Sequence, residues 1–457
     1  MIDTTGPTDR AAAAAPACAP AYRVAPGGTL RGSVQVPGDK SISHRAIMLG
    51  ALADGATPVT GFLEGADSLA TLAAFRAMGV RIDGPEQGRV LIRGVGRDGL
   101  AAPTAPLDVG NAGTAMRLLC GLLAGQRFAS TLIGDASLSR RPMRRVTEPL
   151  ARMGAAIEGT EAGTAPLVIS PAPALAAIHY DMPMASAQVK SCLLLAGLYA
   201  RGETCVTEPA VTRDHTERML TTFGCPVRRA GATVCVQGGS RLRAAPVQVP
   251  ADISSAAFFL VGASIADAAD LTLPGVGINP TRIGVLSILE AMGARIEITN
   301  RRDCGAEPVA DIRVQSAPLH GIEIPAEQVP LAIDEFPALF IAAACAEGET
   351  LLTGAAELRV KESDRIAVMA AGLAQLGVSA EVLPDGIRIR GVGQHGRLGG
   401  GTIDSHGDHR IAMAFAMAAL RAEAPILVRD CENVRTSFPG FAALAAGAGL
   451  GIEEHDA

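Results

Sequence analysis

Residues 37–53 read PGDKSISHRAIMLGALA and join a charged cluster to a run of small and apolar residues. Five more such segments follow at separations of 73, 75, 66, 80 and 75 residues, and the six are centred on Lys40, Gly113, Gln188, Ser254, Asp334 and His409. Each apolar run predicts a helix that is buried nearly all round, and the polar cluster before it marks the helix start. Because a helix start carries unpaired N–H groups and partial positive charge, six of them predict a ligand rich in phosphate and carboxylate.

A second feature repeats with the same period. A glycine follows an amphipathic helix and precedes a short strand at Gly79, Gly154, Gly224, Gly293 and Gly377, and more weakly at Gly449. Glycine after a helix is the usual left-handed stop. Each repeat therefore predicts a supersecondary unit of two helices and several strands, which needs neighbouring units to bury its apolar face.

The repeats predict an α/β fold of two similar lobes, each made of three βαβαββ-type units with buried parallel helices, an inside-out α/β barrel. We expect residues 38–249 to form the N-terminal lobe and residues 21–37 plus 250–457 the C-terminal lobe, after a disordered tail over residues 1–20. The chain would cross near residues 36–38 and 248–252, and a strand over residues 29–36 would pair with the last unit. A double crossover forms a hinge, so the helix starts would face one another across a cleft.

The overall composition excludes several classes of protein. The net charge is −6, aromatic residues make up 3% and Trp is absent, which argues against nucleic-acid binding. The nine cysteines are odd in number and contain no CxxC pair, a pattern that fits a reducing cytosol better than a disulfide scaffold. No apolar run reaches the roughly 18 residues that a membrane span needs. We therefore expect a cytoplasmic protein.

The first charged cluster favours an anion site. Asp39 or Ser41 can cap the helix, whereas Lys40 and Arg45 add positive charge to an end that is already positive. Such a placement is unfavourable unless an anion binds there. At the second helix start, Gly113 would let the backbone approach a ligand, and an ordinary turn is the alternative.

Four arginines lie close together within residues 137–146: Arg140, Arg141, Arg144 and Arg145. If this stretch is helical, the pairs four residues apart repel each other unless an anion lies between them. A solvated basic turn is the alternative. The string RVKESDR at residues 359–365 repeats the arrangement, with a self-neutralising surface helix as its alternative.

Later helix starts carry groups that can bind or activate a ligand. Ser186 and Gln188 suit hydrogen bonds to a phosphate or hydroxyl group, although helix capping explains Ser186 equally well. Asp334 could cap its helix or serve as a general base in a cationic cleft. Residues 406–410, HGDHR, offer too few ligands for a metal site, and Arg410 fits an anion clamp better.

Taken together, six strings resemble the EPSP synthases, the 3-phosphoshikimate 1-carboxyvinyltransferases of the enolpyruvyl transferase family. They are GDKSISHR from residue 38, NAGTAMR from 111, GDASLSRRPM from 134, ASAQVK from 185, RVKESDR from 359 and DHRIAM from 408. The resemblance covers the chain from about residue 23. It implies two lobes joined by a double crossover, and transfer of the enolpyruvyl group of phosphoenolpyruvate to the 5-hydroxyl of shikimate 3-phosphate by addition and elimination.

The resemblance also implies a role for each matching residue. Shikimate 3-phosphate would contact Lys40, Ser41, Arg45, Ser186, Ala187, Gln188, Arg213, Asp334 and Lys361. Phosphoenolpyruvate would contact Lys40, Gly113, Arg141, Gln188, Arg365 and Arg410. Asp334 would take the proton of the 5-hydroxyl. Glu362 and Lys40 would carry out the proton transfers at C3 and at the leaving group. The family resemblance implies no cofactor and no metal, and we expect a monomer whose partners are its two small substrates.

Two rival functions and two departures from the family pattern remain open. The sister transferase for UDP-N-acetylglucosamine typically uses a loop Cys near residues 137–146, where this chain has none, and Cys120 falls in a predicted buried helix. An RNA-binding module could use the arginine cluster. Gly113 stands where glyphosate-tolerant relatives with ASAQVK have Ala, so we expect a sensitive or partly tolerant enzyme. Arg435 is a possible substitute for a cleft Lys that some members have near the C-terminus.

Overall fold

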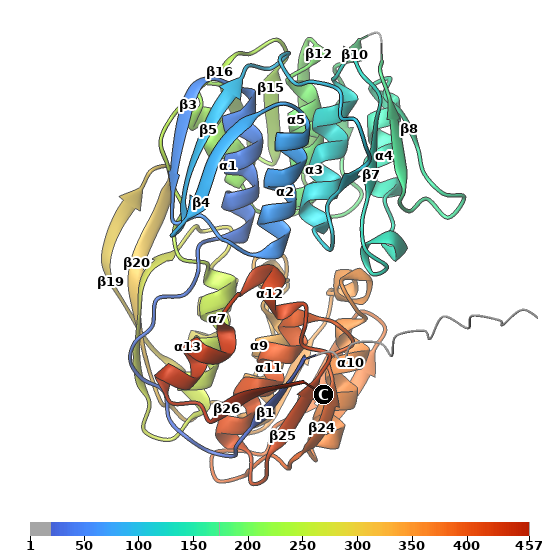
Figure 1. The fold of residues 1–457 in the computed structure, drawn as a ribbon. Coiled ribbons are helices and arrows are strands. Elements are labelled where there is room, and N and C mark those ends of the chain that lie inside the picture. Colours follow the sequence, from blue (N-terminus) through green and yellow to red (C-terminus); the bar gives the residue numbers. More distant parts are fainter. Residues whose placement is uncertain (1–19, 173, 457) are drawn as a thin grey trace, which may run out of the picture.

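The computed structural model describes residues 20–172 and 174–456 and consists of two lobes, one above the other in Figure 1. The core of the upper lobe is formed by residues between Ile42 and Val249. The core of the lower lobe is formed by residues of the N-terminal segment, from Tyr22 to Val36, and by residues from Ala251 to Ile452. The tail predicted over residues 1–20 lies outside the described residues, except that Pro20 begins strand β1.

Each lobe holds three central helices and a second helix after each of them. In the upper lobe the central helices are α1 (Lys40–Leu52), α3 (Gly113–Ala124) and α5 (Ala187–Gly197), followed in turn by α2 (Ala66–Ala77), α4 (Arg144–Arg152) and α6 (His215–Thr222). In the lower lobe they are α7 (Ile253–Ile265), α9 (Phe336–Cys345) and α11 (His409–Ala418), followed by α8 (Gly284–Ala291), α10 (Arg365–Gln375), and α12 (Val434–Ser437) with α13 (Phe441–Ala448). The six predicted helix starts are confirmed to within about two residues.

The central helices are buried because their sequences are apolar on every side. All thirteen residues of α7 are buried, and so are all ten of α9. Small residues let these helices approach closely, and α9 packs against both α7 and α11. Short 3₁₀ helices complete the helical content described here: η1 (Leu138–Arg140), η2 (Ala326–Gln328), η3 (Ala356–Val360) and η4 (Ala419–Arg421).

Mixed sheets cover the central helices of the upper lobe. One has the order β16 (Leu242–Arg243), β3 (Ala53–Thr60), β5 (Arg89–Val95), β4 (Arg81–Glu86), with β17 (Val247–Gln248) also on β3. The second runs β6 (Leu107–Asp108), β7 (Ser130–Ile133), β9 (Leu167–Ser170), β8 (Ala156–Glu158), and the third runs β11 (His179–Asp181), β13 (Glu203–Thr207), β15 (Thr233–Gln237), β14 (Val227–Ala230). A short pair joins β10 (Leu175–Ala176) to β12 (Ala200–Arg201).

The lower lobe repeats this plan. Its sheets run β19 (Arg295–Cys304), β20 (Glu307–Gln315), β18 (Asp270–Gly277), β2 (Arg31–Ser33); β21 (Glu349–Leu352), β23 (Gly386–Arg390), β22 (Ser379–Leu383); and β24 (Gly401–Asp404), β25 (Ile426–Arg429), β1 (Pro20–Val24), β26 (Ile452–Asp456). In both lobes a central helix connects two parallel strands, as α3 connects β6 to β7 and α11 connects β24 to β25. A crossover helix is the usual link between parallel strands.

The two segments of the chain that pass between the lobes lie side by side. Gly38 and Ala251 form an antiparallel bridge. The N–H of Asp39 donates to the carbonyl of Pro250 at 2.8 Å, and the N–H of Asp252 donates to the carbonyl of Pro37 at 2.9 Å. Because Asp39 and Asp252 are the N-caps of α1 and α7, the crossover fixes these two helix starts relative to each other.

The predicted strand over residues 29–36 is wrong in extent and in partner. Only Arg31–Ser33 is a strand, and this β2 pairs with β18. The strand that pairs with the last unit is β1, which lies earlier in the sequence and contacts both β25 and β26. Between the two strands Gly27 and Gly28 adopt left-handed φ values of 76° and 99°, which turn the chain away from the last unit.

The arginine cluster and the RVKESDR string are not continuous helices. Arg141 is extended between η1 and α4, as expected for a residue that precedes a proline. Similarly, η3 ends at Val360 and α10 begins only at Arg365. Like-charge repulsion along a helix therefore does not apply to either cluster, and the side chains are free to point in different directions.

The cysteines depart from the expected reduced pattern. Cys205 on β13 and Cys235 on β15 form a disulfide, with their Cα atoms 4.1 Å apart. The two residues are direct partners in the antiparallel register of these strands. A separation of 30 residues in sequence gives no sign of this pairing. No helix in the described part of the chain is long and apolar enough to cross a membrane.

Candidate active site

A cavity of about 390 Å³ lies between the lobes, and all six helix starts open onto it. Its walls include the six residues on which the repeats are centred, Lys40, Gly113, Gln188, Ser254, Asp334 and His409. The helices of the two lobes thus point their positive ends at one space. Backbone N–H groups at these ends are donors for anions.

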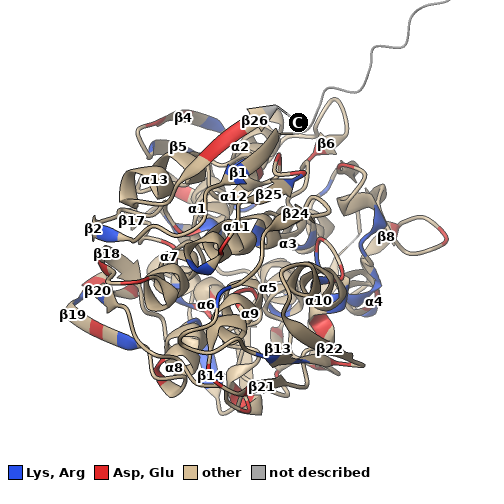
Figure 2. Cartoon of the chain, turned by 90° about the horizontal axis from the view of Figure 1, so that it is seen from below, with Lys and Arg blue, Asp and Glu red and all other residues tan. Residues whose placement is uncertain are grey.

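The side chains that line the cavity strengthen its positive character. Nine are Lys or Arg and five are Asp or Glu: the basic residues are Lys40, Arg117, Arg141, Arg145, Arg213, Arg282, Lys361, Arg365 and Arg410, and the acidic ones are Asp67, Asp252, Asp334, Glu357 and Glu362. Figure 2 shows basic and acidic residues on segments throughout the molecule. The excess of positive charge is therefore a local property of the cleft, in a chain whose net charge is −6.

The structure brings together nearly all the site residues that the sequence predicts. The cavity is lined by Lys40, Ser41, Gly113, Arg141, Ser186, Ala187, Gln188, Arg213, Asp334, Lys361, Glu362, Arg365 and Arg410. Arg45 does not line it. Its guanidinium lies behind the wall, where it donates to the hydroxyls of Thr216 at 2.7 Å and Ser191 at 2.9 Å.

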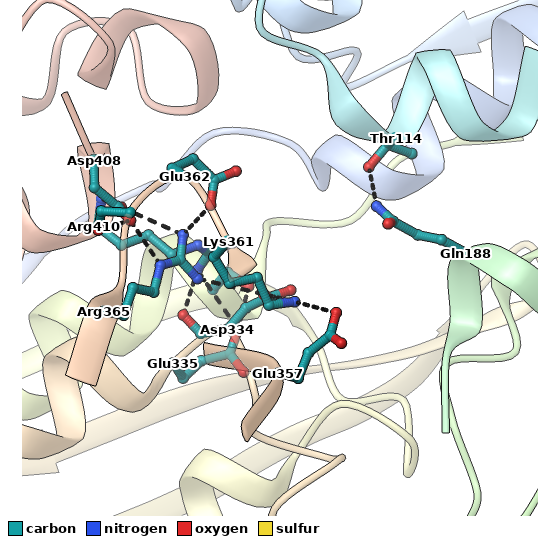
Figure 3. A network of polar contacts seen from close by, with 12 residues as sticks. Thr114, Gln188, Asp334, Glu335, Glu357, Lys361, Glu362, Arg365, Asp408 and Arg410 are labelled. Atoms are coloured by element: carbon teal, nitrogen blue, oxygen red, sulfur yellow. Dashed lines mark hydrogen bonds and ion pairs between the residues drawn. The ribbon is translucent and has the colours of Figure 1, made fainter. Parts of the chain in front are cut away.

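Asp334 lies at the centre of the cationic groups of the cleft, just before α9 (Figure 3). Its carboxylate contacts Arg213 of the upper lobe, Lys361 Nζ at 3.3 Å and Arg365 Nη1 at 3.6 Å. Burial raises the pKa of Asp334, but Arg213 and Lys361, with Arg410 and Arg365, outweigh burial and hold that pKa well below its usual range. Asp334 is therefore ionised.

Glu362 is held by arginines from both lobes. Arg141 Nη1 of the upper lobe contacts Glu362 Oε1 at 3.1 Å, and Arg365 Nη2 contacts Oε2 at 2.6 Å. Burial raises the pKa of Glu362, while Arg141 and Arg365 lower it by more, so this carboxyl also has a pKa well below its usual range. Paired with these two arginines, Glu362 is thus a carboxylate and not an acid.

Several polar residues that the sequence analysis missed orient these groups. Asp408, the N-cap of α11, is fully buried and accepts from Arg365 Nε at 2.8 Å (Figure 3). Asp67 contacts Lys40 Nζ at 2.8 Å. Thr114 Oγ1 accepts a hydrogen bond at 3.2 Å from Nε2 of Gln188, which the sequence analysis did name, and so ties the start of α3 to the start of α5. These partners come from distant parts of the chain, and only the motif residues among them carried a signal in the sequence.

Arg282 is a further missed residue and lies beneath the crossover. Its guanidinium is buried and contacts Asp39 at 3.3 Å and Asp252 at 3.5 Å, the caps of α1 and α7. Burial lowers the pKa of Arg282, but Asp39 and Asp252 outweigh it and raise that pKa above its usual value. Arg282 thus holds a helix start of each lobe in a fixed position at the base of the cavity.

His409 faces the cavity with both ring nitrogens unpaired among the described residues. Burial first, and then Lys40 and Arg410, hold the pKa of His409 well below its usual range, so the ring is neutral. Arg435 does not fill the role suggested for it. Its side chain is 68% exposed, pairs with Glu432 in the turn before α12 and does not line the cavity.

The chain has the fold of the enolpyruvyl transferases. The enolpyruvyl transferase NikO of Streptomyces tendae superposes with a TM-score of 0.76 over 96% of this chain and 99% of that protein. At 19% identity this likeness shows the fold alone. The EPSP synthase of Acinetobacter baumannii is closer, with a TM-score of 0.85 and 57% identity over 95% of this chain and all of that one.

The sequence comparisons narrow the class to one family. The family model of EPSP synthase (3-phosphoshikimate 1-carboxyvinyltransferase) matches residues 24–444. The 3-phosphoshikimate 1-carboxyvinyltransferases of Alkalilimnicola ehrlichii and Halorhodospira halophila are each 68% identical to the chain, and the alignments cover 95% and 94% of it and 97% of each relative. The chain belongs to the EPSP synthase family, as its motifs predicted. It is an enzyme of the shikimate pathway of aromatic amino acid biosynthesis and transfers the carboxyvinyl group of phosphoenolpyruvate to shikimate 3-phosphate.

Proposed function

We propose that the cavity between the lobes is the place of this transfer and that both lobes contribute to it. The observation that carries the proposal is the convergence of six helix starts and nine basic side chains on one space. Shikimate 3-phosphate and phosphoenolpyruvate each carry a phosphate and a carboxylate, so four anionic groups meet in the reaction. Arg side chains and helix N-termini bind such groups in fixed geometry.

We assign each substrate to a set of residues at the helix starts of both lobes. Ser41 on α1, Ser186, Ala187 and Gln188 at the start of α5, and Arg213 before α6 would hold shikimate 3-phosphate from above, with Asp334 and Lys361 below. Gly113, Arg141 and the shared Gln188 would hold phosphoenolpyruvate from above, with Arg365 and Arg410 below. Lys40 would contact both. Arg45, behind the wall, would act on shikimate 3-phosphate through Ser41, whose carbonyl it holds at 2.9 Å.

The reaction proceeds by addition and then elimination. Asp334 takes the proton of the 5-hydroxyl as its oxygen bonds to C2 of phosphoenolpyruvate, while Glu362 delivers a proton to C3. The tetrahedral adduct then loses phosphate as Lys40 donates a proton to the leaving oxygen, and a C3 proton returns to Glu362. The proton that Asp334 took from the hydroxyl passes through solvent and restores the ammonium group of Lys40. Electrons and protons balance, because one proton moves from the hydroxyl to the released phosphate over the whole sequence.

Substrate binding would prepare both carboxyls for these steps. The same arginines that would bind substrate anions are paired with Asp334 and Glu362 in this structure. When a phosphate or carboxylate takes over these cations, the pKa of each carboxyl rises toward its ordinary value, which makes Asp334 a stronger base and lets Glu362 take up a proton. The chemistry is thereby confined to the loaded enzyme.

We also propose that the fold consists of two inside-out α/β barrels of three units, with residues 38–249 as one lobe and residues 21–37 plus 250–457 as the other. We further propose that the enzyme acts as a cytoplasmic monomer without metal or cofactor. Among the described residues, Glu203, Cys205 and Cys235 could place ligand atoms around a metal, but both sulfurs belong to the disulfide and none of the three lines the cavity.

A phosphate-release assay tests the assignment of substrates. The protein is mixed with phosphoenolpyruvate and with shikimate 3-phosphate, UDP-N-acetylglucosamine or no acceptor. We expect release only with shikimate 3-phosphate. Release only with the nucleotide sugar would support the sister transferase. Salt-sensitive retention of RNA on a filter, with no release in any arm, would support a binding module instead.

Gly113→Ala is expected to weaken inhibition by glyphosate more than it weakens use of phosphoenolpyruvate. A methyl group at Gly113 would lie 2.9 Å from Arg141 Nη1 and 3.2 Å from Arg117 Nη1, so both guanidinium groups must shift by a few tenths of an ångström. The ligand with the tighter fit beside Gly113 loses more. The measurement compares the inhibition constant of glyphosate with the KM of phosphoenolpyruvate in both proteins, and equal changes in the two constants contradict the prediction.

A further inference from the structure

Three pairs of opposite charge join the lobes among the described residues that line the cavity. They are Arg141 with Glu362, Arg213 with Asp334, and Arg145 with Glu357. In each pair the arginine comes from the upper lobe and the carboxylate from the lower lobe. All three contacts therefore depend on how close the two lobes lie to each other.

The pair of Arg145 with Glu357 differs from the other two pairs in its relation to the substrates. Arg141, Arg213, Asp334 and Glu362 all have a role toward a substrate, so substrate anions compete for their partners. Arg145 and Glu357 line the same cavity but are assigned to neither substrate. Their pair can therefore persist when the cleft is occupied.

Arg145 and Glu357 both line the cavity and make a close contact between the lobes. Arg145 in the first turn of α4 places Nη1 at 2.9 Å and 3.1 Å from the two carboxylate oxygens of Glu357 on η3. The side chains are 16% and 24% exposed, so solvent and salt screen the contact only in part. Burial raises the pKa of Glu357, but Lys361 and Arg145 outweigh it and lower that pKa, which keeps Glu357 ionised.

Glu357 also contacts the binding machinery on its own lobe. Lys361 Nζ lies 3.5 Å from Glu357 Oε1 and 3.3 Å from Asp334 Oδ1 (Figure 3). A variant of Glu357 therefore disturbs Lys361 as well as the contact between the lobes. A variant of Arg145 removes the contact between the lobes and leaves Lys361 with both its acidic partners.

We propose that Arg145 and Glu357 are positioning residues that latch the two lobes together over the bound substrates. The proposal rests on the function proposed above, because it assumes that the closed cleft is the reactive state. If only the closed state binds both substrates productively, the apparent affinity falls in proportion to the closed fraction. Loss of the latch then raises the KM of both substrates by a common factor, while kcat, measured with both sites filled, changes little.

The test uses Arg145→Gln, Glu357→Gln and the exchanged pair Arg145→Glu with Glu357→Arg. Arg144→Gln is the matched control, since Arg144 is the neighbouring arginine of the same helix and its exposed guanidinium donates to the carbonyl of Glu161. We expect Arg145→Gln to raise both KM values by a common factor of about 5 or more, the exchanged pair to restore the KM of phosphoenolpyruvate, which Lys361 does not contact, and the control to match wild type. The wild-type KM values should also rise with salt, and those of Arg145→Gln should respond less.

Other outcomes overturn the proposal. A change in the KM of one substrate alone would make Arg145 a ligand residue, and a fall in kcat at unchanged KM would give it a chemical role. Unchanged constants in Arg145→Gln would show that the pair does not hold the lobes together. If Arg145→Gln folds poorly, Arg145→Lys, which keeps the charge, is measured in its place. Its KM values are then compared with those of Glu357→Asp.

Solution scattering separates failure of the latch from failure of the proposed function. The radius of gyration of the ligand-free protein does not depend on which substrates it uses. We expect Arg145→Gln to be more extended than wild type and than Arg144→Gln. Equal radii in all three proteins contradict the latch, whereas absence of phosphate release with shikimate 3-phosphate in wild type contradicts only the function.

Discussion

Asp334→Asn should lower kcat by about 10²- to 10⁴-fold, the range typical for loss of a general base. The amide keeps the size of the side chain but cannot accept the proton of the 5-hydroxyl. The same range applies to Glu362→Gln, which removes the group assigned to proton transfer at C3. Steady-state phosphate release at saturating substrates gives kcat for each variant. Near-normal kcat in both variants would show that neither carboxyl has the role assigned to it.

The pH dependence of stability provides a check on Asp334 that does not involve turnover. Its folded pKa lies well below the unfolded value of about 3.9, so its contribution to stability is complete above about pH 5 and is lost as the pH falls through the folded pKa. Asp334→Asn should therefore be less stable than wild type at pH 7. The difference should shrink as the pH falls below about 4, and a difference that is constant from pH 7 to pH 3 would contradict the ion pairs of Asp334.

Lys190→Met should destabilise the upper lobe by about 3–5 kcal/mol, the usual effect of removing one partner of a buried ion pair. Lys190 is fully buried in α5, and its Nζ contacts Glu208 at 2.9 Å and Glu217 at 2.7 Å. Without the ammonium group two carboxylates remain buried beside each other. Since whole domains are stable by about 5–15 kcal/mol, this single change is a large fraction of the total.

Hydrogen exchange of the α5 amides is the suitable measurement, because two lobes with separate cores need not unfold together. A further variant that combines Lys190→Met with Glu208→Gln and Glu217→Gln removes the stranded charges and should recover much of the loss. A loss below about 1 kcal/mol in Lys190→Met would mean that the carboxylates find other partners or bind protons. The comparison thus separates the cost of unpaired charge from that of the missing side chain.

The repeated pattern of the sequence predicted where the helices begin and that their starts gather around a ligand. Period and composition are local properties, so the starts at Lys40, Gly113 and His409 could be located to the residue. The motifs of the family then identified the individual side chains that are expected to contact the substrates. Arg45 shows the limit of this transfer, since its side chain lies behind the wall of the cavity and not on it.

Contacts between distant parts of the chain could not be predicted in the same way. Arg145 and Glu357 are 212 residues apart, and Arg282 is 243 residues from Asp39. Nothing in the local pattern of either partner indicates such a contact. The disulfide between Cys205 and Cys235 depends on the register of two strands, which a count of cysteines does not contain.

The central claim is that one cleft, built from both lobes, holds both substrates. A crystal structure with shikimate 3-phosphate and a non-reactive analogue of phosphoenolpyruvate tests it most directly. We predict that one molecule of shikimate 3-phosphate contacts Ser186 and Arg213 from the upper lobe and Asp334 from the lower lobe, with the analogue beside it against Arg141 and Arg410. Density for either ligand on a single lobe, away from the six helix starts, would contradict the account.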